Sequence, residues 1–130
     1  MTEKKLEYNI IPLYTFSGVI NRVVDADTVE ATLDMGFRIF TTQRLRIDSF
    51  DAPETWRPRN DAEEKHGIAA TVRAKELLVG KDLLFTTSKR SGIYGRFGAS
   101  ITLPDGRNFA KTMIEEGFQK RDEYVVEETS

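Results

Sequence analysis

Three strand-like runs joined by two very short turns fill the first third of the chain, and they leave few folds open to it. Aromatic, β-branched or alternating side chains make up these runs, at residues 14–24, 29–33 and 37–47. Asp25–Thr28 and Asp34–Gly36 form the turns, where Asp side chains can bond the nearby backbone. This order predicts a β-meander. Gly18 inside the first run is typical of a bulge or of the bend in a small barrel.

After the meander the pattern changes to a loop and a helix. Residues 56–65 are predicted to form a basic, aromatic loop. A helix is predicted over residues 66–79, with Gly80 placed to cap its end. Its spacing puts three apolar side chains on one face: Ile68, Val72 and Val79. The single histidine, His66, falls at the predicted helix start.

Two further strands and a second helix complete the expected elements. The strands are predicted at residues 82–87 and 97–103, with a loop of small and charged residues between them. Asn108 can cap the second helix and Gly117 can stop it. The side chains expected to face inward from this helix are Ala110, Met113 and Ile114.

Five short strands with a helix between the third and the fourth are typical of a small barrel of the OB type. The predicted fold class is therefore α+β, mainly β: a five-stranded OB-fold Greek-key β-barrel with two to three α-helices. An SH3-like barrel is the competing architecture, but it rarely carries a helix of this length at that point. We expect a flexible arm at residues 1–12, one folded domain over residues 13–122 and a C-terminal tail at residues 123–130.

Composition narrows the functional classes. The chain has 130 residues, a formal net charge of −2 and no cysteine. This charge argues against broad, salt-dependent coating of DNA, but a small, focused phosphate site stays open. No apolar run is long enough to span a membrane, and the N-terminus lacks the features of a signal peptide. We therefore expect a monomeric, cytoplasmic protein with no membrane partner and no obligatory protein partner.

Residues 44–54, RLRIDSFDAPE, concentrate two arginines, two aspartates and a glutamate. Alternation in the first half puts the charged side chains on one face of a strand. Pro53 fixes φ and removes a donor, so the strand must stop and turn there. Asp51 and Glu54 are then held near each other. Such a group suits either a structural ion-pair network or a site that holds a hard cation and a phosphate together.

Carboxylates from two turns are expected to meet. If the second and third strands form a hairpin, Asp27 and Asp51 lie at the same open end, away from the connecting turn. Two carboxylates, a backbone carbonyl and waters would make a calcium-type site. Turn chemistry alone is the competing interpretation for Asp25 and Asp27.

Two arginines could act on a metal-bound phosphate. Arg46 lies on the charged side of its strand, and Arg96 comes from the loop before the fifth strand. Together they would neutralise the charge that builds during attack at phosphorus. Glu54 is the candidate to activate a water, or to orient one bound to the cation. Tyr94 could bond a phosphate oxygen or pack on a ribose, although a plain turn also explains residues 94–96.

The loop before the first helix offers a further contact surface. Trp56, Arg57 and Arg59 could contact a nucleic-acid strand by stacking and charge. A mobile surface loop fits the same residues equally well.

Three separated motifs agree with one known pattern in order and in spacing. They are VDADTV at residues 24–29, RIDSFDAPE at residues 46–54 and YGR at residues 94–96. The turn and helix from Gly106 to Gly117 agree as well. On these motifs the chain resembles the staphylococcal nuclease (thermonuclease) family over about residues 15–120, and three motifs in order are far more specific than any one of them.

The resemblance implies an OB barrel that hydrolyses phosphodiester bonds in DNA and RNA, usually with calcium. By position, Asp27, Asp51 and the carbonyl of Ala52 would hold one Ca²⁺ ion, with Mg²⁺ or Mn²⁺ as alternatives.

The resemblance also implies how the chemistry would run. Glu54 would orient or deprotonate the attacking water, while Arg46 and Arg96 would grip the phosphate and stabilise the transition state. In-line attack would leave a 5′-hydroxyl and a 3′-phosphate.

The chain departs from the family pattern at three points. Ala26 replaces the glycine usual between the two turn aspartates, and Ile93 replaces a lysine often found before the tyrosine. The tyrosine that stacks on a base near the C-terminus has no clean match, since Glu123 falls there by offset and Tyr124 lies one residue along.

We therefore expect a Ca²⁺-dependent nuclease that cuts DNA or RNA, internally or from ends. The residues expected to contact the substrate strand are Tyr94, Tyr124, Arg57 and Arg59. A catalytically weak or inactive OB module that binds nucleic acid or a protein is the alternative. The complete set of acidic and arginine residues favours the enzyme.

Overall fold

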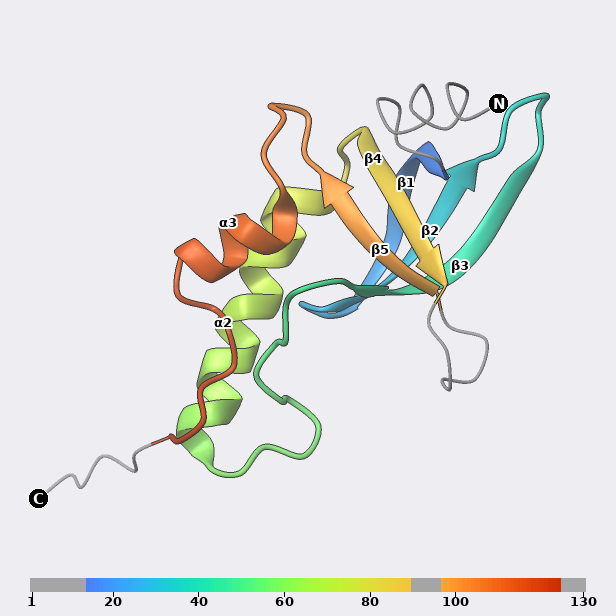
Figure 1. Cartoon of the computed structure of the whole chain (residues 1–130). Helices are drawn as coiled ribbons and strands as arrows, with labels where there is room; N and C mark the ends of the chain where they lie inside the picture. Colours follow the sequence, from blue (N-terminus) through green and yellow to red (C-terminus); the bar gives the residue numbers. More distant parts are fainter. Residues whose placement is uncertain (1–13, 90–96, 125–130) are drawn as a thin grey trace, which may run out of the picture.

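A closed five-stranded barrel with two helices packed beside it makes up the computed structural model, which describes residues 14–89 and 97–124 (Figure 1). The strands are β1 (Thr15–Asp25), β2 (Thr28–Asp34), β3 (Phe40–Ile47), β4 (Leu83–Lys89) and β5 (Phe97–Thr102). The helices are α2 (Asp61–Leu78), which lies between β3 and β4, and α3 (Phe109–Glu115). This confirms the predicted α+β barrel of the OB type.

Strand order around the barrel is β1-β2-β3-β5-β4. The predicted meander is confirmed, because β1, β2 and β3 pair antiparallel in sequence order. The parallel pairing lies between β3 and β5, where Leu45 is opposite Phe97 and Ile47 is opposite Ala99. This pairing closes the barrel next to the end of β3, at the edge where the charged residues of the sequence gather.

The predicted start of the third strand was wrong. The third strand begins at Phe40 and not at residue 37, because Phe37 and Arg38 have φ of 55° and 64°. These left-handed values are incompatible with an extended strand. The turn is held instead by the carboxylate of Asp34, which accepts a hydrogen bond from the backbone N–H of Gly36 at 2.9 Å.

Gly18 is the corner at which β1 passes from one neighbour to another. It is opposite Leu33 of β2 and also opposite Leu83 of β4. A Cβ built there would lie 2.6 Å from the carbonyl oxygen of Thr32 and 3.0 Å from Phe85. The absence of a side chain therefore lets three strands meet closely enough to close the barrel, as the glycine inside the first predicted strand indicated.

Small residues let α2 approach the barrel. Ala70 and Ala74 are fully buried, together with Leu78 near the helix end. The predicted apolar face was wrong, because Ile68, Val72 and Val79 are 51%, 53% and 51% exposed. The buried face of the helix carries Gly67, Ala70 and Ala74 along its length and Leu77 and Leu78 at its end.

The ends of the second predicted helix are confirmed, but only two of the three side chains predicted to face inward are buried. The side chain of Asn108 accepts a hydrogen bond from the backbone N–H of Lys111, which is the expected cap. Ala110 and Met113 are buried as predicted, whereas Ile114 is 42% exposed and was placed wrongly.

Replacing Gly18 with alanine is expected to destabilise the barrel by about 1–3 kcal/mol, since overpacking against backbone leaves no room for relaxation. Urea unfolding measures this loss. Ser17→Ala, at the exposed neighbouring position, is the matched control and is expected to change stability by less than about 0.5 kcal/mol. Equal stability of the two variants would contradict the role assigned to Gly18.

Candidate active site

The end of β3 and the β1–β2 turn lie side by side. Thr28 pairs with Arg46, and the backbone N–H of Ile47 donates to the carbonyl oxygen of Asp27 at 2.8 Å. The hairpin of β2 and β3 therefore brings Asp27 to the residues that follow β3, as its geometry predicted.

Arg46 lies at the centre of this arrangement. Its Nη1 donates to the carbonyl oxygens of Ile47 and Phe50 at 2.8 and 2.6 Å. Its Nη2 donates to Oδ1 of Asp51 and lies 3.3 Å from Oδ2 of Asp27. The Arg46 and Asp27 side chains are 19% and 15% exposed, against 67% for Asp51. One guanidinium thus bridges two carboxylates, of which one is enclosed and the other is open to solvent.

Asp27 is fixed by its other contacts. Its Oδ2 accepts a hydrogen bond from the backbone N–H of Ala52 at 2.8 Å, and its Oδ1 accepts one from the hydroxyl of Thr28 at 3.0 Å. Since these bonds come from two segments, Asp27 joins the β1–β2 turn to the turn after β3.

The turn that carries Glu54 packs directly against α2. Pro53 is fully buried, and Thr55 donates from its hydroxyl to Oδ1 of Asp25 at 2.9 Å. A Cβ built on Gly67 of α2 would lie 2.7 Å from the carbonyl oxygen of Pro53. Gly67 therefore lets the turn rest on the helix, and the side chain of Glu54 stays exposed.

A segment near the C-terminus lies against the turn after β3, and the two together enclose a cavity. We call residues 117–124 the C-terminal segment. The backbone N–H of Lys120 donates to the carbonyl oxygen of Asp51 at 2.8 Å, and the Asp51 N–H donates to Oε1 of Gln119 at 3.2 Å. The resulting cavity measures about 470 Å³. Its lining side chains are Asp27, Arg46, Asp51, Ala52, Glu54, Arg59, Gln119, Lys120, Arg121 and Asp122.

Sequence reasoning missed the contribution of Gln119, Lys120, Arg121 and Asp122. No local signal marks them, because the hydrogen bond between Asp51 and Gln119 joins residues 68 positions apart. Only the fold brings them to the cavity.

Glu63 is the buried charge next to the C-terminal segment. Its side chain is 0% exposed and accepts hydrogen bonds from the backbone N–H of Arg59 at 2.7 Å and from the Arg59 guanidinium at 3.3 and 3.4 Å. Lys120 Nζ lies 3.7 Å from its Oε2. Burial alone would raise the pKa of Glu63, but the bonds from Arg59 and the charge of Lys120 outweigh it and leave this pKa below its usual range.

Two residues predicted to contact substrate are held by the protein itself. Arg59 donates from Nη2 to the carbonyl oxygen of Arg121 at 2.6 Å and from Nη1 to that of Asp122. The guanidinium of Arg59 also lies over the ring of Tyr124, at 5.0 Å from its centroid. Tyr124 is 8% exposed, so stacking on a base would require it to leave this contact. Substrate binding by both residues stays a prediction.

His66 does not start the helix, which corrects its predicted place. Helix α2 begins five residues earlier, at Asp61, with Asn60 as its cap. The ring nitrogens of His66 contact the Tyr124 hydroxyl at 2.6 Å and the carbonyl oxygen of Gly117 at 2.8 Å. His66 therefore fastens both ends of the C-terminal segment to α2.

Arg57 is not among the residues that line the cavity. Arg57 stacks over the ring of the exposed Trp56 at 4.8 Å, on the loop before α2. Tyr94 and Arg96 lie outside the described residues. The described chain resumes at Phe97, which is opposite Leu45 and comes one residue before Gly98, the partner of Arg46.

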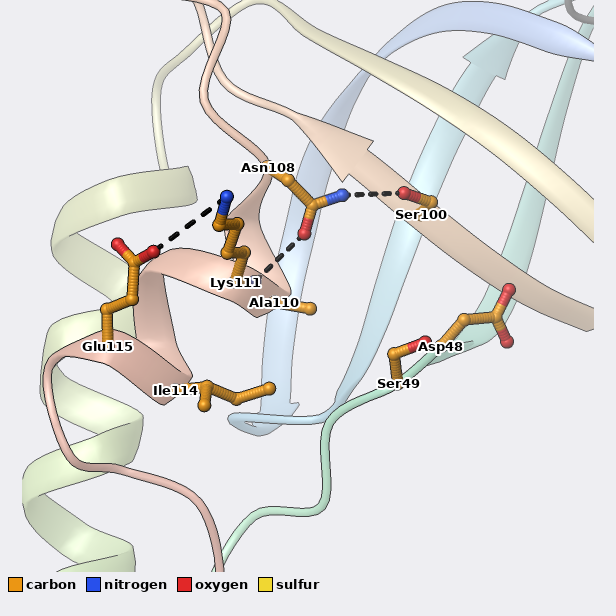
Figure 2. A pocket seen from close by; sticks show the side chains of 8 residues that line it. All are labelled: Asp48, Ser49, Ser100, Asn108, Ala110, Lys111, Ile114 and Glu115. Carbon is orange, nitrogen blue, oxygen red and sulfur yellow. Dashed lines mark hydrogen bonds and ion pairs between the residues drawn. The ribbon is translucent and has the colours of Figure 1, made fainter.

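A second hollow lies on the other side of the β3 end, between β5 and α3, and measures about 400 Å³. Figure 2 shows Asp48 and Ser49 on one side of it and Lys111 and Ile114 of α3 on the other. Two of its lining side chains, Asp48 and Glu115, are acidic and one is basic. The first cavity is the better candidate for binding phosphate, because four basic side chains line it: Arg46, Arg59, Lys120 and Arg121.

The donor set suits a hard cation. Among residues 14–89 and 97–124, no group of three or more His, Cys, Asp or Glu side chains is arranged to hold a metal ion. However, one oxygen each of Asp27 and Asp51 contacts the same Arg46 nitrogen, so the two oxygens lie within about 6 Å of each other. Two oxygens on one Ca²⁺ lie up to about 5 Å apart. The separation that these contacts allow therefore overlaps the spacing of two oxygen ligands on one cation.

Comparison with known proteins gives consistent similarities. The family model described as "Staphylococcal nuclease homologue" matches residues 44–129, which is more than half of the chain. A protein of Escherichia coli O157:H7 named "Uncharacterized endonuclease" is 31% identical over 100 residues, which are 77% of this chain and 57% of that protein. "Staphylococcal nuclease domain-containing protein 1" of Schizosaccharomyces pombe is 25% identical over 116 residues, 86% of this chain and 12% of that protein. The chain thus spans little more than half of one relative and a small part of the other.

Replacing Gly67 with alanine is expected to destabilise the protein, although alanine is the better helix former by about 1 kcal/mol. The new Cβ would press on the backbone of the turn that carries Glu54, and that backbone is held by buried Pro53. Thermal unfolding measures the effect, and Val72→Ala on the exposed face of α2 is the control. A rise in melting temperature in the Gly67 variant would show that the turn can move away.

The lowered pKa of Glu63 predicts a pH dependence of stability. Because the folded state has the lower pKa, the ionised carboxylate stabilises the fold fully above the ordinary glutamate pKa of 4.5. This stabilisation is lost as pH falls through the folded pKa. Urea unfolding at a series of pH values is expected to show a shallower decline in Glu63→Gln than in the unchanged protein. Glu64→Gln, which alters an exposed neighbour, is expected to keep the original slope.

Proposed function

Since the chain belongs to the staphylococcal nuclease homologue family, we propose that it is a metal-dependent nuclease that hydrolyses phosphodiester bonds of DNA or RNA. One observation carries this proposal most directly. The cavity places Arg46 between Asp27 and Asp51 and has Glu54 on its rim. Cation ligands, a phosphate-binding fork and a carboxylate able to handle water therefore share one open hollow.

The proposed cation is Ca²⁺, with Mg²⁺ or Mn²⁺ as alternatives, held by Asp27, Asp51 and the carbonyl of Ala52. Oxygen donors are the ligands that these ions prefer, and two carboxylates beside one guanidinium leave a net negative site for a cation to fill. The bound ion would polarise the phosphate and raise the acidity of a water. Asp27, enclosed and fixed by the Ala52 N–H, would keep its carboxylate in one orientation.

Arg46 would hold the phosphate. With the cation between the carboxylates, its Nη2 would be released from them and could turn to a phosphate oxygen, while Nη1 stays on the carbonyl oxygens of Ile47 and Phe50. Arg96 would join it, because the chain enters β5 beside Leu45 and Arg46. Donors already aimed at developing charge lower a barrier most, since little reorganisation is needed.

Glu54 would orient or deprotonate the attacking water. It is exposed on a turn that is rigid because Pro53 is buried and Thr55 is bonded to Asp25. In-line attack would yield a 5′-hydroxyl and a 3′-phosphate.

Tyr94 and Arg57 remain proposed contacts of the substrate strand. Among the described residues, no helix has the length and apolar character needed to cross a bilayer.

The test is cleavage of single-stranded and double-stranded DNA and of RNA, with Ca²⁺, with Mg²⁺ and with a chelator. Cleavage that requires a cation and yields 3′-phosphate ends would support the proposal. Strand binding without cleavage under any cation, by a protein shown to be folded, would instead favour the binding module.

Glu54→Gln is expected to lower kcat by about a hundredfold or more, since a group that handles the attacking proton contributes roughly 10²–10⁴ in rate. The side chain is exposed, so the fold should be unchanged. Single-turnover cleavage at saturating Ca²⁺ measures the effect, with Glu64→Gln as the equally charged control. A Glu54 variant as fast as this control would remove Glu54 from the mechanism.

A further inference from the structure

The side chain of Asp51 is exposed, but hydrogen bonds hold its backbone in place. Its carbonyl oxygen accepts from the N–H of Lys120, and its own N–H donates to the side chain of Gln119. Both bonds come from the C-terminal segment. Because Asp51 follows β3 without being part of it, the direction of its Cα–Cβ bond depends on this segment, together with the bonds that hold its neighbours Phe50 and Ala52.

The two residues directly before helix α2 in turn hold the C-terminal segment. Arg59 donates to the carbonyl oxygens of Arg121 and Asp122, and Asn60 donates to that of Tyr124 at 2.8 Å. Figure 1 shows the segment, in red, running beside α2. These bonds fix the backbone of the segment. The segment in turn holds the backbone of Asp51 through the hydrogen bond from the N–H of Lys120.

Glu63 joins the two sides of this contact. Its two oxygens are shared between Arg59, which binds the far part of the segment, and Lys120, which bonds Asp51. The backbone N–H of Glu63 donates to Oδ1 of the cap residue Asn60 at 3.0 Å, so its place in the first turn of the helix is fixed. A fully buried carboxylate must keep its cationic partners close, because separating them would leave a desolvated charge. Glu63 therefore sets the distance between α2 and Lys120.

We propose that Glu63 is a positioning residue for the cation site: through Lys120 it holds the backbone of Asp51 so that its carboxylate reaches the same cation as Asp27. This inference rests on the proposed function and names a residue that the family pattern quoted above does not contain. Glu63 touches neither the substrate nor the cation. Its effect is on cation affinity, and through it on the Ca²⁺ concentration that activity requires.

The variant that tests this is Glu63→Gln, which keeps the shape and removes the charge. Glu64→Gln is the matched control, since it removes an equal charge one residue away on the exposed side of α2. Isothermal titration of the protein with CaCl₂, without nucleic acid, measures affinity. We expect about tenfold weaker Ca²⁺ binding in Glu63→Gln, as is typical when an outer-shell partner is lost, and unchanged binding in Glu64→Gln.

Amide hydrogen exchange supplies a readout that needs neither metal nor activity. The N–H of Lys120 that bonds Asp51 is expected to exchange faster in Glu63→Gln than in the control.

At saturating Ca²⁺, kcat is expected to return to within about twofold of the unchanged protein, because affinity and not chemistry is altered.

Loss of a buried charge could also unfold the protein, and a second pair of variants covers that case. Lys120→Met leaves Glu63 paired with Arg59, and Lys120→Arg restores the cation. The first is expected to weaken Ca²⁺ binding and the second to recover it. Arg73→Gln breaks the exposed pair with Glu116 between α2 and the end of α3, away from Asp51, and is expected to leave Ca²⁺ affinity unchanged.

The outcomes separate the inference from the proposed function. Unchanged Ca²⁺ affinity and unchanged Lys120 exchange in a folded Glu63→Gln or Lys120→Met variant would overturn the positioning role, even if the unchanged protein cleaves DNA. If the unchanged protein binds no divalent cation, the proposed function and the effect on affinity both fail, while faster Lys120 exchange would still show that Glu63 holds Asp51.

Discussion

The hydrogen bonds and ion pairs of the Arg46 guanidinium are the interactions on which the rest of the candidate site depends. The guanidinium binds the carbonyl oxygens of Ile47 and Phe50 and so shapes the chain as it leaves β3. It also lies between the carboxylates of Asp27 and Asp51, which would repel each other without a cation between them. A largely enclosed cation needs such partners as much as they need it. The same ion pairs therefore stabilise the fold and keep together the oxygens that a divalent cation would use.

The cavity is assembled from segments far apart in sequence, and α2 is the element that supports them. Gly67 lets the turn around Glu54 rest on the helix, and His66 and Glu63 fasten the C-terminal segment to it. The apolar faces of a small barrel cannot supply this support, because its strands end at the rim where the site lies. A helix laid across that rim gives exposed catalytic candidates a rigid base, which is what precise placement requires.

Local patterns predicted the strands well and the helix faces poorly. Alternation and turn chemistry placed β1, β2 and the end of β3, because pairing within a meander is decided by neighbours in sequence. The face of α2 was predicted from Ile68 and Val72, yet these are half exposed and the alanines are buried. The buried face carries Gly67, Ala70, Ala74 and Leu78, so the size of an apolar side chain did not by itself identify it.

The sequence by itself determined the meander, the charged turn after β3 and the convergence of Asp27 with Asp51, because each depends on short-range register and on the stop imposed by Pro53. Only the tertiary structure decided what stands behind them. Asp51 is bonded to Lys120 and Gln119, and the buried Glu63 is paired with Lys120. No regular sequence spacing relates these residues. Such contacts are set by how the helix and the last segment pack on the barrel, and packing is a property of the whole chain.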